Sequence, residues 1–262
     1  MELKRVIGLR RSVRFLNPER PVERAKIQMM LEAARRASHW GNVQALRAVV
    51  IERATAPREV LERFEGLANA YQVNFAPIII AWYLDTAAVD EQPERLREIV
   101  DARAMGVNYD KMKDYLERTL IPFFVRANEN LKLPGPSEID CGQGIAQATL
   151  VAFDEGLGCC LLGGQRLNRL GNDLGLPASA RILLLQTVGY PAEDVEASGQ
   201  RPRLPFEELF HLNRFGVPFP RDTKVVQDLE DAGMIQRVGP DDRIRRDEEL
   251  AALALKYGFP NH

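Results

Sequence analysis

The sequence predicts an α+β fold, and three observations support this class. Stretches with helical spacing of apolar residues dominate the 262 residues. Strand-like stretches are few, four or five in all. Strands and helices do not follow each other in a regular βαβ order, which argues against a parallel α/β sheet. With 45% hydrophobic and 27% charged residues, the composition is typical of a soluble globular protein.

The expected elements follow from apolar spacing and from turn residues. Pro21 can open a helix because its missing N–H costs nothing in the first turn. Helices are predicted over residues 1–9, from Pro21 toward Gly41, and over 57–70, 92–131 with a break at Pro122, 138–153, 166–174, 205–213, 223–233 and 247–257. Strands are predicted over residues 43–52, 76–85, 159–162 and 181–190.

The helix predicted over residues 138–153 is unusually rich in small side chains. Gly142 and Gly144 each cost about 1 kcal/mol relative to alanine inside a helix. Their presence indicates close approach by another backbone or a cofactor, and we interpret them as packing residues of a dimer interface. Gly142-Gln143-Gly144 also looks like the start of a dinucleotide fingerprint. Residue 147 is glutamine instead of the third glycine, so we reject an NAD site there.

Several classes of function receive no support from the composition. The net charge of −2 and the pI of about 6.0 give no sign of a nucleic-acid or membrane-surface partner. The apolar runs are too short to span a bilayer, and the absence of an apolar leader leads us to expect a cytoplasmic location. The cysteines (Cys141, Cys159, Cys160) and histidines (His39, His211, His262) form no spaced ligand set, so no metal site is predicted.

Four separated segments carry a resemblance to a known family. They are Arg10–Arg14, residues 38–44, residues 140–164, and residues 188–191 with Arg201-Pro202-Arg203. In this order and at these separations they resemble the nitroreductase family of flavoproteins. The resemblance covers about residues 1–215, is loose over 90–135, and does not include the tail after about 220.

The resemblance implies a fold, an assembly and an activity. The expected fold is a central, mostly antiparallel sheet of four to five strands surrounded by helices in an intertwined homodimer. Residues 1–220 would form the FMN-binding domain, and residues 221–262 a helical extension packed on the dimer. The implied activity passes a hydride from NADH or NADPH through flavin N5 to a small electron acceptor such as a nitroaromatic or a quinone, without a catalytic side chain.

The basic run Arg10–Arg14 is the best-marked candidate for binding the cofactor. In an extended stretch alternate side chains share a face, so Arg10, Ser12 and Arg14 can act together. Arg11, on the opposite face, is the weakest of the four cofactor-binding candidates in the run. Arginine binds phosphate through paired N–H groups, and a serine hydroxyl can add one donor. By resemblance, Arg10 and Ser12 bind the FMN phosphate and Arg14 lies near the pyrimidine edge of the ring. The alternative is a solvated patch of surface charge.

Further candidates come from the other segments. By resemblance, Arg201 and Arg203 complete the phosphate site, and backbone N–H groups of Leu162, Gly163 and Gly164 lie near N5. Ser38, Asn42 and Gln44 would reach the flavin of the neighbouring subunit. The alternatives are ordinary turns at Gly41-Asn42 and Gly163-Gly164.

The loop over residues 38–44 departs from the family pattern. Ala45-Leu46 stands where a proline and an aromatic residue are usual, and Trp40 where small residues are common. The shape of the substrate is therefore open. Two other readings remain: a specialised branch of the family (a dehydrogenase, a dehalogenase or a flavin-degrading enzyme) and a flavin-binding protein without nitroreductase turnover.

Overall fold

A single antiparallel sheet organises the molecule. The computed structural model describes residues 1–64, 70–163, 167–194, 200–236 and 240–258. In this part of the chain four strands pair in the order β1-β2-β4-β3. They are β1 (Leu46–Glu52), β2 (Ile78–Asp85), β3 (Gly158–Leu162) and β4 (Ala180–Gly189). The α+β class, the antiparallel sheet and the four predicted strands are confirmed; the intertwined homodimer stays a prediction.

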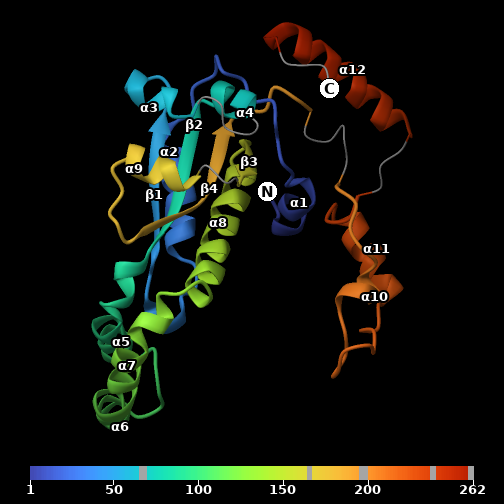
Figure 1. The fold of residues 1–262 in the computed structure, drawn as a ribbon. Helices are drawn as coiled ribbons and strands as arrows, with labels where there is room; N and C mark the ends of the chain where they lie inside the picture. Colours follow the sequence, from blue (N-terminus) through green and yellow to red (C-terminus); the bar gives the residue numbers. More distant parts are fainter. Residues whose placement is uncertain (65–69, 164–166, 195–199, 237–239, 259–262) are drawn as a thin grey trace.

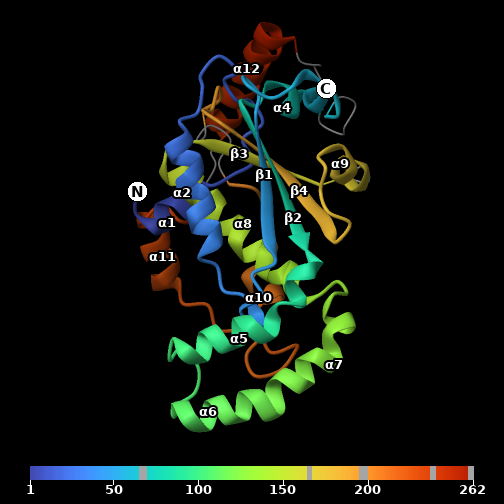
Figure 2. The same ribbon diagram turned by 90° about the vertical axis from the view of Figure 1, so that its left-hand side faces the viewer.

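Helices surround the sheet (Figure 1). Helices α5 to α7 lie together at one end of it, whereas α12 lies near α4 at the other (Figure 2). Among the described residues, none of the helices combines the length and apolar content needed to cross a bilayer. The helices are α1 (Leu3–Leu9), α2 (Arg24–Arg35), α3 (Arg58–Glu62), α4 (Ala70–Phe75), α5 (Gln92–Asp101), α6 (Tyr109–Tyr115), α7 (Ile121–Leu131), α8 (Pro136–Asp154), α9 (Leu167–Asp173), α10 (Phe206–Leu209), α11 (Thr223–Asp231) and α12 (Pro240–Tyr257).

The core forms where α2 and α8 cover the sheet. Ile79, Ile80 and Trp82 of β2 are almost completely buried, as the apolar run predicts. The Trp82 indole N–H donates to Gln186 Oε1 at 2.8 Å, and Gln186 Nε2 donates to Thr149 Oγ1 at 3.1 Å. This chain of hydrogen bonds joins β2, β4 and α8, and it satisfies polar groups that would be costly to bury alone.

Gly144 permits close packing, but inside one chain. A Cβ at residue 144 would stand 2.5 Å from Cδ2 of Leu46 and 3.1 Å from the carbonyl oxygen of Ala34, so α8 can press against β1 and α2 only without a side chain there. The dimer-interface interpretation is therefore wrong for Gly144. Gly142, in contrast, is exposed and has nothing within 4 Å of its Cβ position.

The helices predicted over residues 57–70, 92–131 and 205–213 differ from the structure. The 92–131 helix is interrupted between Asp101 and Tyr109, and the 205–213 helix ends at Leu209. Pro122 does not break its helix, because a π-helical turn over Leu116–Leu120 precedes it and Pro122 falls at the start of α7, where the missing N–H is tolerated. The helix predicted over residues 57–70 ends at Glu62, where the chain turns to bury Phe64 at 1% exposure. The unexpected α4 follows.

The tail packs on its own chain. Gly8 of α1 lies against Gly233, since a Cβ at residue 8 would stand 1.9 Å from the Gly233 carbonyl oxygen. In α12, Leu253 and Ala254 are buried, and Phe75 of α4 contacts Tyr257 with ring centroids 5.9 Å apart. The domain boundary at residue 220 stays a prediction.

Candidate functional site

The Arg10–Arg14 run is extended and lies beside β3. Ser12 forms a parallel bridge with Cys159, and the Val13 N–H donates to the Cys159 carbonyl at 3.0 Å. Arg11 and Val13 are buried, whereas Arg10, Ser12 and Arg14 remain partly exposed. The run therefore presents one face to the interior and the other, with two arginines and a serine, to its surroundings.

Arg11 belongs to the interior, despite its charge. Its Nε donates to the Leu9 carbonyl at 3.1 Å, and Nη2 donates to Gln236 Oε1 at 3.1 Å. The structure therefore separates Arg11 from the other candidates of the run and connects it to the segment after α11.

Ser12, Arg14 and Arg201 gather around one thiol. Burial raises the pKa of Cys160, and the increase is opposed by the charge of Arg14, by a hydrogen bond with Ser12 and by the charge of Arg201. Partial desolvation lowers the pKa of Arg201, and repulsion by Arg14 and Arg203 lowers it further. Within the described ranges, neither Arg14 nor Arg201 pairs with a carboxylate. Such a group of unpaired cations favours an anion.

The structure describes three of the four remaining candidates near this cluster, Leu162, Gly163 and Arg203. Leu162 ends β3 and pairs with Leu185, and Gly163 follows with nothing within 4 Å of its Cβ position. Arg203 is exposed, and its Nη1 donates to the Pro202 carbonyl at 3.0 Å. Gly164 lies outside the described residues. Cys160 was missed by sequence reasoning, because an apolar strand gives no sign of which side chain faces the basic run.

Ser38, Asn42 and Gln44 lie on a loop that is fixed to the start of α8. The Trp40 N–H donates to Asp140 Oδ2 at 2.7 Å, and its indole N–H donates to Ser137 Oγ at 3.2 Å. Asn42 and Gln44 both have left-handed backbones, with φ of 55° and 52°. Asparagine tolerates this conformation, but for glutamine it is strained, as is common at functional sites.

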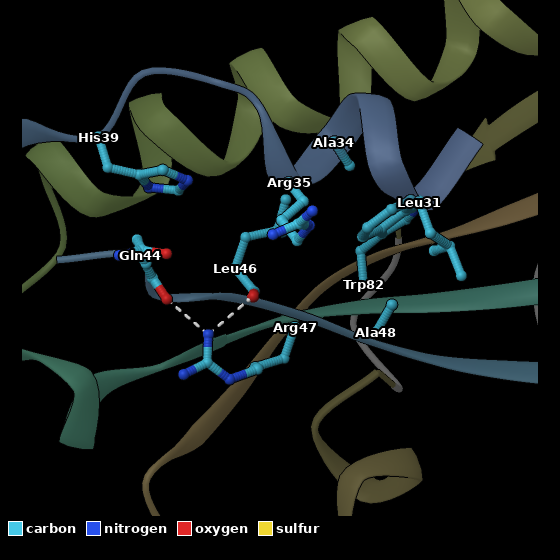
Figure 3. Close-up of a pocket in the computed structure, with 9 residues that line it drawn as sticks. All are labelled: Leu31, Ala34, Arg35, His39, Gln44, Leu46, Arg47, Ala48 and Trp82. Atoms are coloured by element: carbon cyan, nitrogen blue, oxygen red, sulfur yellow. Dashed lines mark hydrogen bonds between the residues drawn. The ribbon is translucent and has the colours of Figure 1, made fainter. Parts of the chain in front are cut away.

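Arg47 stabilises the strained loop. Its Nη1 donates to the carbonyl oxygens of Gln44 and Leu46, at 2.5 and 2.9 Å (Figure 3). Gln44 and Arg47 also border a pocket of about 350 Å³, whose walls come from α2, this loop, β1 and β2 (Figure 3). The lining residues are Leu31, Ala34, Arg35, His39, Gln44, Leu46, Arg47, Ala48 and Trp82. Sequence reasoning missed the pocket, since its walls come from separate elements.

His39 borders the same pocket and is nearly enclosed. Its side chain is 6% exposed, and Nδ1 lies 4.0 Å from Asp140 Oδ2. Burial lowers the pKa of His39 below its ordinary value of 6.5; Asp140 opposes this decrease and Arg47 adds to it. The imidazole is therefore mainly neutral at neutral pH.

The two groups of candidates lie at opposite ends of α8. The Ser38–Gln44 loop contacts Asp140, whereas the basic run lies beside Gly158, just after α8 ends at Asp154. At about 1.5 Å of rise per residue, Asp140 and Asp154 are roughly 21 Å apart along the helix. One chain does not bring Asn42 and Gln44 together with Ser12 and Arg14.

Comparison with known proteins gives a consistent result. The family model described as the nitroreductase family matches residues 7–190. The chain is 30% identical over 200 residues to an NADH dehydrogenase of Thermus thermophilus, an alignment that covers 76% of this chain and 90% of the relative. It is 33% identical over 91 residues to an FMN reductase (NADPH) of Bacillus subtilis, covering 34% of this chain and 35% of that one.

Solved structures show the same fold. A protein from Exiguobacterium sibiricum, assigned as a nitroreductase and crystallised with FMN, has a TM-score of 0.67 at 21% identity and covers 81% of this chain and 98% of its own. A nitroreductase family protein from Streptococcus pneumoniae has a TM-score of 0.61 at 22% identity, covering 81% and 100%. The matched residues 7–190 include the basic run, the loop after α2, and α8 with β3. The chain therefore belongs to the nitroreductase family.

Proposed function

We propose that the protein is an FMN-dependent oxidoreductase that passes a hydride from NADH or NADPH to a small electron acceptor, such as a nitroaromatic or a quinone. The observation that carries this proposal is the group of cations, Arg14 and Arg201, which act with Ser12 on Cys160 of β3 and pair with no carboxylate among the described residues. When bound, FMN supplies the hydride-accepting N5 position, and the protein supplies binding and charge.

The residues fit the chemistry of FMN. Its phosphate is a dianion, and Arg10, Ser12, Arg201 and Arg203 would provide cations and a hydroxyl donor for it. Arg14 would hold positive charge near the pyrimidine edge, which favours the reduced, anionic ring. Nothing lies within 4 Å of the Cβ position of Gly163, which leaves room for the flavin ring to approach the N–H groups of Leu162 and Gly163.

A homodimer would complete the site. Ser38, Asn42 and Gln44 would serve the flavin of the partner subunit, which the separation of the two groups along α8 supports. The exposed side of α8 carries the small residues Gly142 and Ala146, which allow close helix packing. After α10, the chain exposes apolar side chains, including Phe215 at 92%, and such patches mark interfaces.

The position of Trp40 favours a second candidate function, a more specialised reaction. Trp40, at a place where the family pattern has small residues, is held by Ser137 and lies 6.1 Å from the Phe124 ring. A bulky aromatic pair at this loop could restrict the acceptor, as in a dehydrogenase, a dehalogenase or a flavin-degrading enzyme. Slow turnover of every nitroaromatic and quinone tested, despite bound FMN, would favour this second candidate.

The visible spectrum tests the main proposal directly. The full chain, loaded with FMN and freed of excess, should show a flavin band that NADH or NADPH bleaches without oxygen and an acceptor restores. Arg10→Gln should bind FMN more weakly, whereas Arg58→Gln, in an exposed i,i+4 pair with Glu62, should not. A protein that stays colourless after incubation with FMN would overturn the proposal.

A further inference from the structure

We infer that Glu193, held by Arg246 of α12, is a positioning residue for the Arg10–Arg14 run, so that the C-terminal tail sets the affinity of the flavin site. This inference rests on the proposed function. Glu193, Arg246 and the other side chains that carry it lie outside residues 7–190, the part matched by the family model.

The Glu193 carboxylate fixes the backbone of the basic run. Its Oε1 accepts the N–H groups of Arg14 at 2.5 Å and Phe15 at 3.0 Å. The following residues continue as a backbone pairing, since Leu16 bridges Pro191 and the Ala192 N–H donates to the Phe15 carbonyl at 2.8 Å. Glu193 therefore ends this pairing at Arg14, whose side chain would lie near the flavin.

Arg246 holds the carboxylate from the other side. Arg246 Nη2 pairs with Glu193 Oε2, and Nη1 donates to Glu249 Oε2 at 2.9 Å. The Glu193 side chain is 4% exposed and that of Arg246 is 11% exposed, so the pair is shielded from water. Glu249 also accepts the N–H of Asp194, next to Glu193. One turn of α12 thus holds the segment that positions Arg14.

A second set of hydrogen bonds joins the tail to the two basic runs. Gln200, directly before Arg201, donates from Nε2 to the carbonyl oxygens of Gly8 at 3.0 Å and Met234 at 2.6 Å. Its Oε1 accepts the N–H of Gln236 at 3.1 Å, and Gln236 in turn binds Arg11. The segment after α11 therefore connects the residues before Arg10 with those before Arg201.

In this arrangement the tail does more than stabilise the fold, because it supports the backbone that carries Arg14. Arg14 and Arg201 repel one another, so cations around an anion site need rigid support from the backbone. Glu193 supplies this support by accepting the backbone N–H groups of Arg14 and Phe15. Loss of Arg246 would leave the buried carboxylate without its cation, and Glu193 would then move toward water and release the run.

The test compares two neighbouring arginines of α12 in the full-length protein. Arg246→Gln removes the buried partner, whereas Arg245→Gln makes the same change of charge at a side chain that is 58% exposed. FMN affinity is measured by quenching of flavin fluorescence. Arg246→Gln should raise the Kd about tenfold or more, since small displacements of a binding group have large effects. Arg245→Gln should stay within about twofold, as expected of exposed pairs.

A second variant covers the case in which Arg246→Gln fails to fold. Glu193→Leu with Arg246→Met removes both charges and keeps similar volumes, a replacement that buried ion pairs often tolerate. It should fold by circular dichroism, bind FMN more weakly, and shift the midpoint potential of the bound flavin to more negative values because Arg14 is no longer fixed.

The outcomes separate the inference from the proposed function. No FMN binding by the unaltered protein would overturn both. FMN binding by the unaltered protein, with the same Kd and midpoint potential in the folded double variant, would overturn this inference alone. Equal weakening by Arg245→Gln and Arg246→Gln would also overturn it, because the effect would then be one of net charge.

Discussion

Gly158 packs directly against Val13: a Cβ at residue 158 would stand 2.8 Å from the Val13 Cβ. Gly158→Ala should therefore push the basic run away from β3 and destabilise the fold by about 1–3 kcal/mol, as overpacking does. Urea unfolding measures the change. Gly142→Ala is the matched control, because nothing lies within 4 Å of its Cβ position and alanine favours a helix. Equal stability of the two variants would show that Val13 can move aside.

A site shared between subunits predicts complementation. Two double variants each damage one half of the shared FMN site: Arg10→Gln/Arg14→Gln in one half and Asn42→Ala/Gln44→Ala in the other. The homodimer of either variant should therefore bind FMN weakly. Random exchange of subunits would give heterodimers with one intact site, restoring about a quarter of all sites in an equal mixture. FMN fluorescence measures the recovered binding sites, and native mass spectrometry measures the fraction of heterodimers. Heterodimers that form without recovery of FMN binding would argue that each site belongs to one chain.

The hydrogen-bond chain from Trp82 through Gln186 to Thr149 should contribute measurably to stability. Thr149→Val keeps the side-chain shape but leaves Gln186 Nε2 without its acceptor, which costs about 1–3 kcal/mol for a buried donor. Thr119→Val, at an exposed position, should change the free energy of unfolding by less than about 0.5 kcal/mol. Thermal and urea unfolding provide the comparison, and equal effects of the two variants would contradict it.

His39 should make the protein less stable in mild acid. Its folded pKa lies below 6.5, so as the pH falls the unfolded chain takes up the proton first. The stability that His39 contributes is fully present above pH 6.5 and is lost as the pH falls through the pKa of the folded state. Urea unfolding between pH 8 and 5 should show this loss, and His39→Gln should remove it. The carboxylate of Glu52 should not contribute in this pH range, because its hydrogen bond with Arg24 lowers its pKa below 4.5. An unchanged slope in His39→Gln would contradict the prediction.

Local patterns predicted the strands because their signals are contained in a few residues. Val49-Val50-Ile51 and the apolar run of β2 indicate buried strands wherever their partners lie. The alternation in the Arg10–Arg14 run likewise follows from extended backbone alone. The same reasoning failed at Pro122, because a π-helical turn is not encoded by any spacing of apolar residues.

Long-range contacts could not be predicted in this way. Gly144 indicated a close approach, but nothing near it in the sequence identifies Leu46 and Ala34 as the neighbours. Glu193 and Arg246 are ordinary charged residues in a sequence with many, and only the folded chain shows that they are buried together. The pocket beside Arg47 could not be predicted for the same reason, because its walls meet only when α2 covers β1 and β2.

The contact between Glu193 and Arg246 has a reciprocal consequence. If docking of α12 strengthens FMN binding by a given free energy, bound FMN must strengthen the docking of α12 by the same amount. Amide hydrogens of α12 should then exchange more slowly with solvent in the FMN-loaded protein, and a protease should cut the tail more readily in the apoprotein. The C-terminal helix would thus report cofactor occupancy on the outer surface of the molecule.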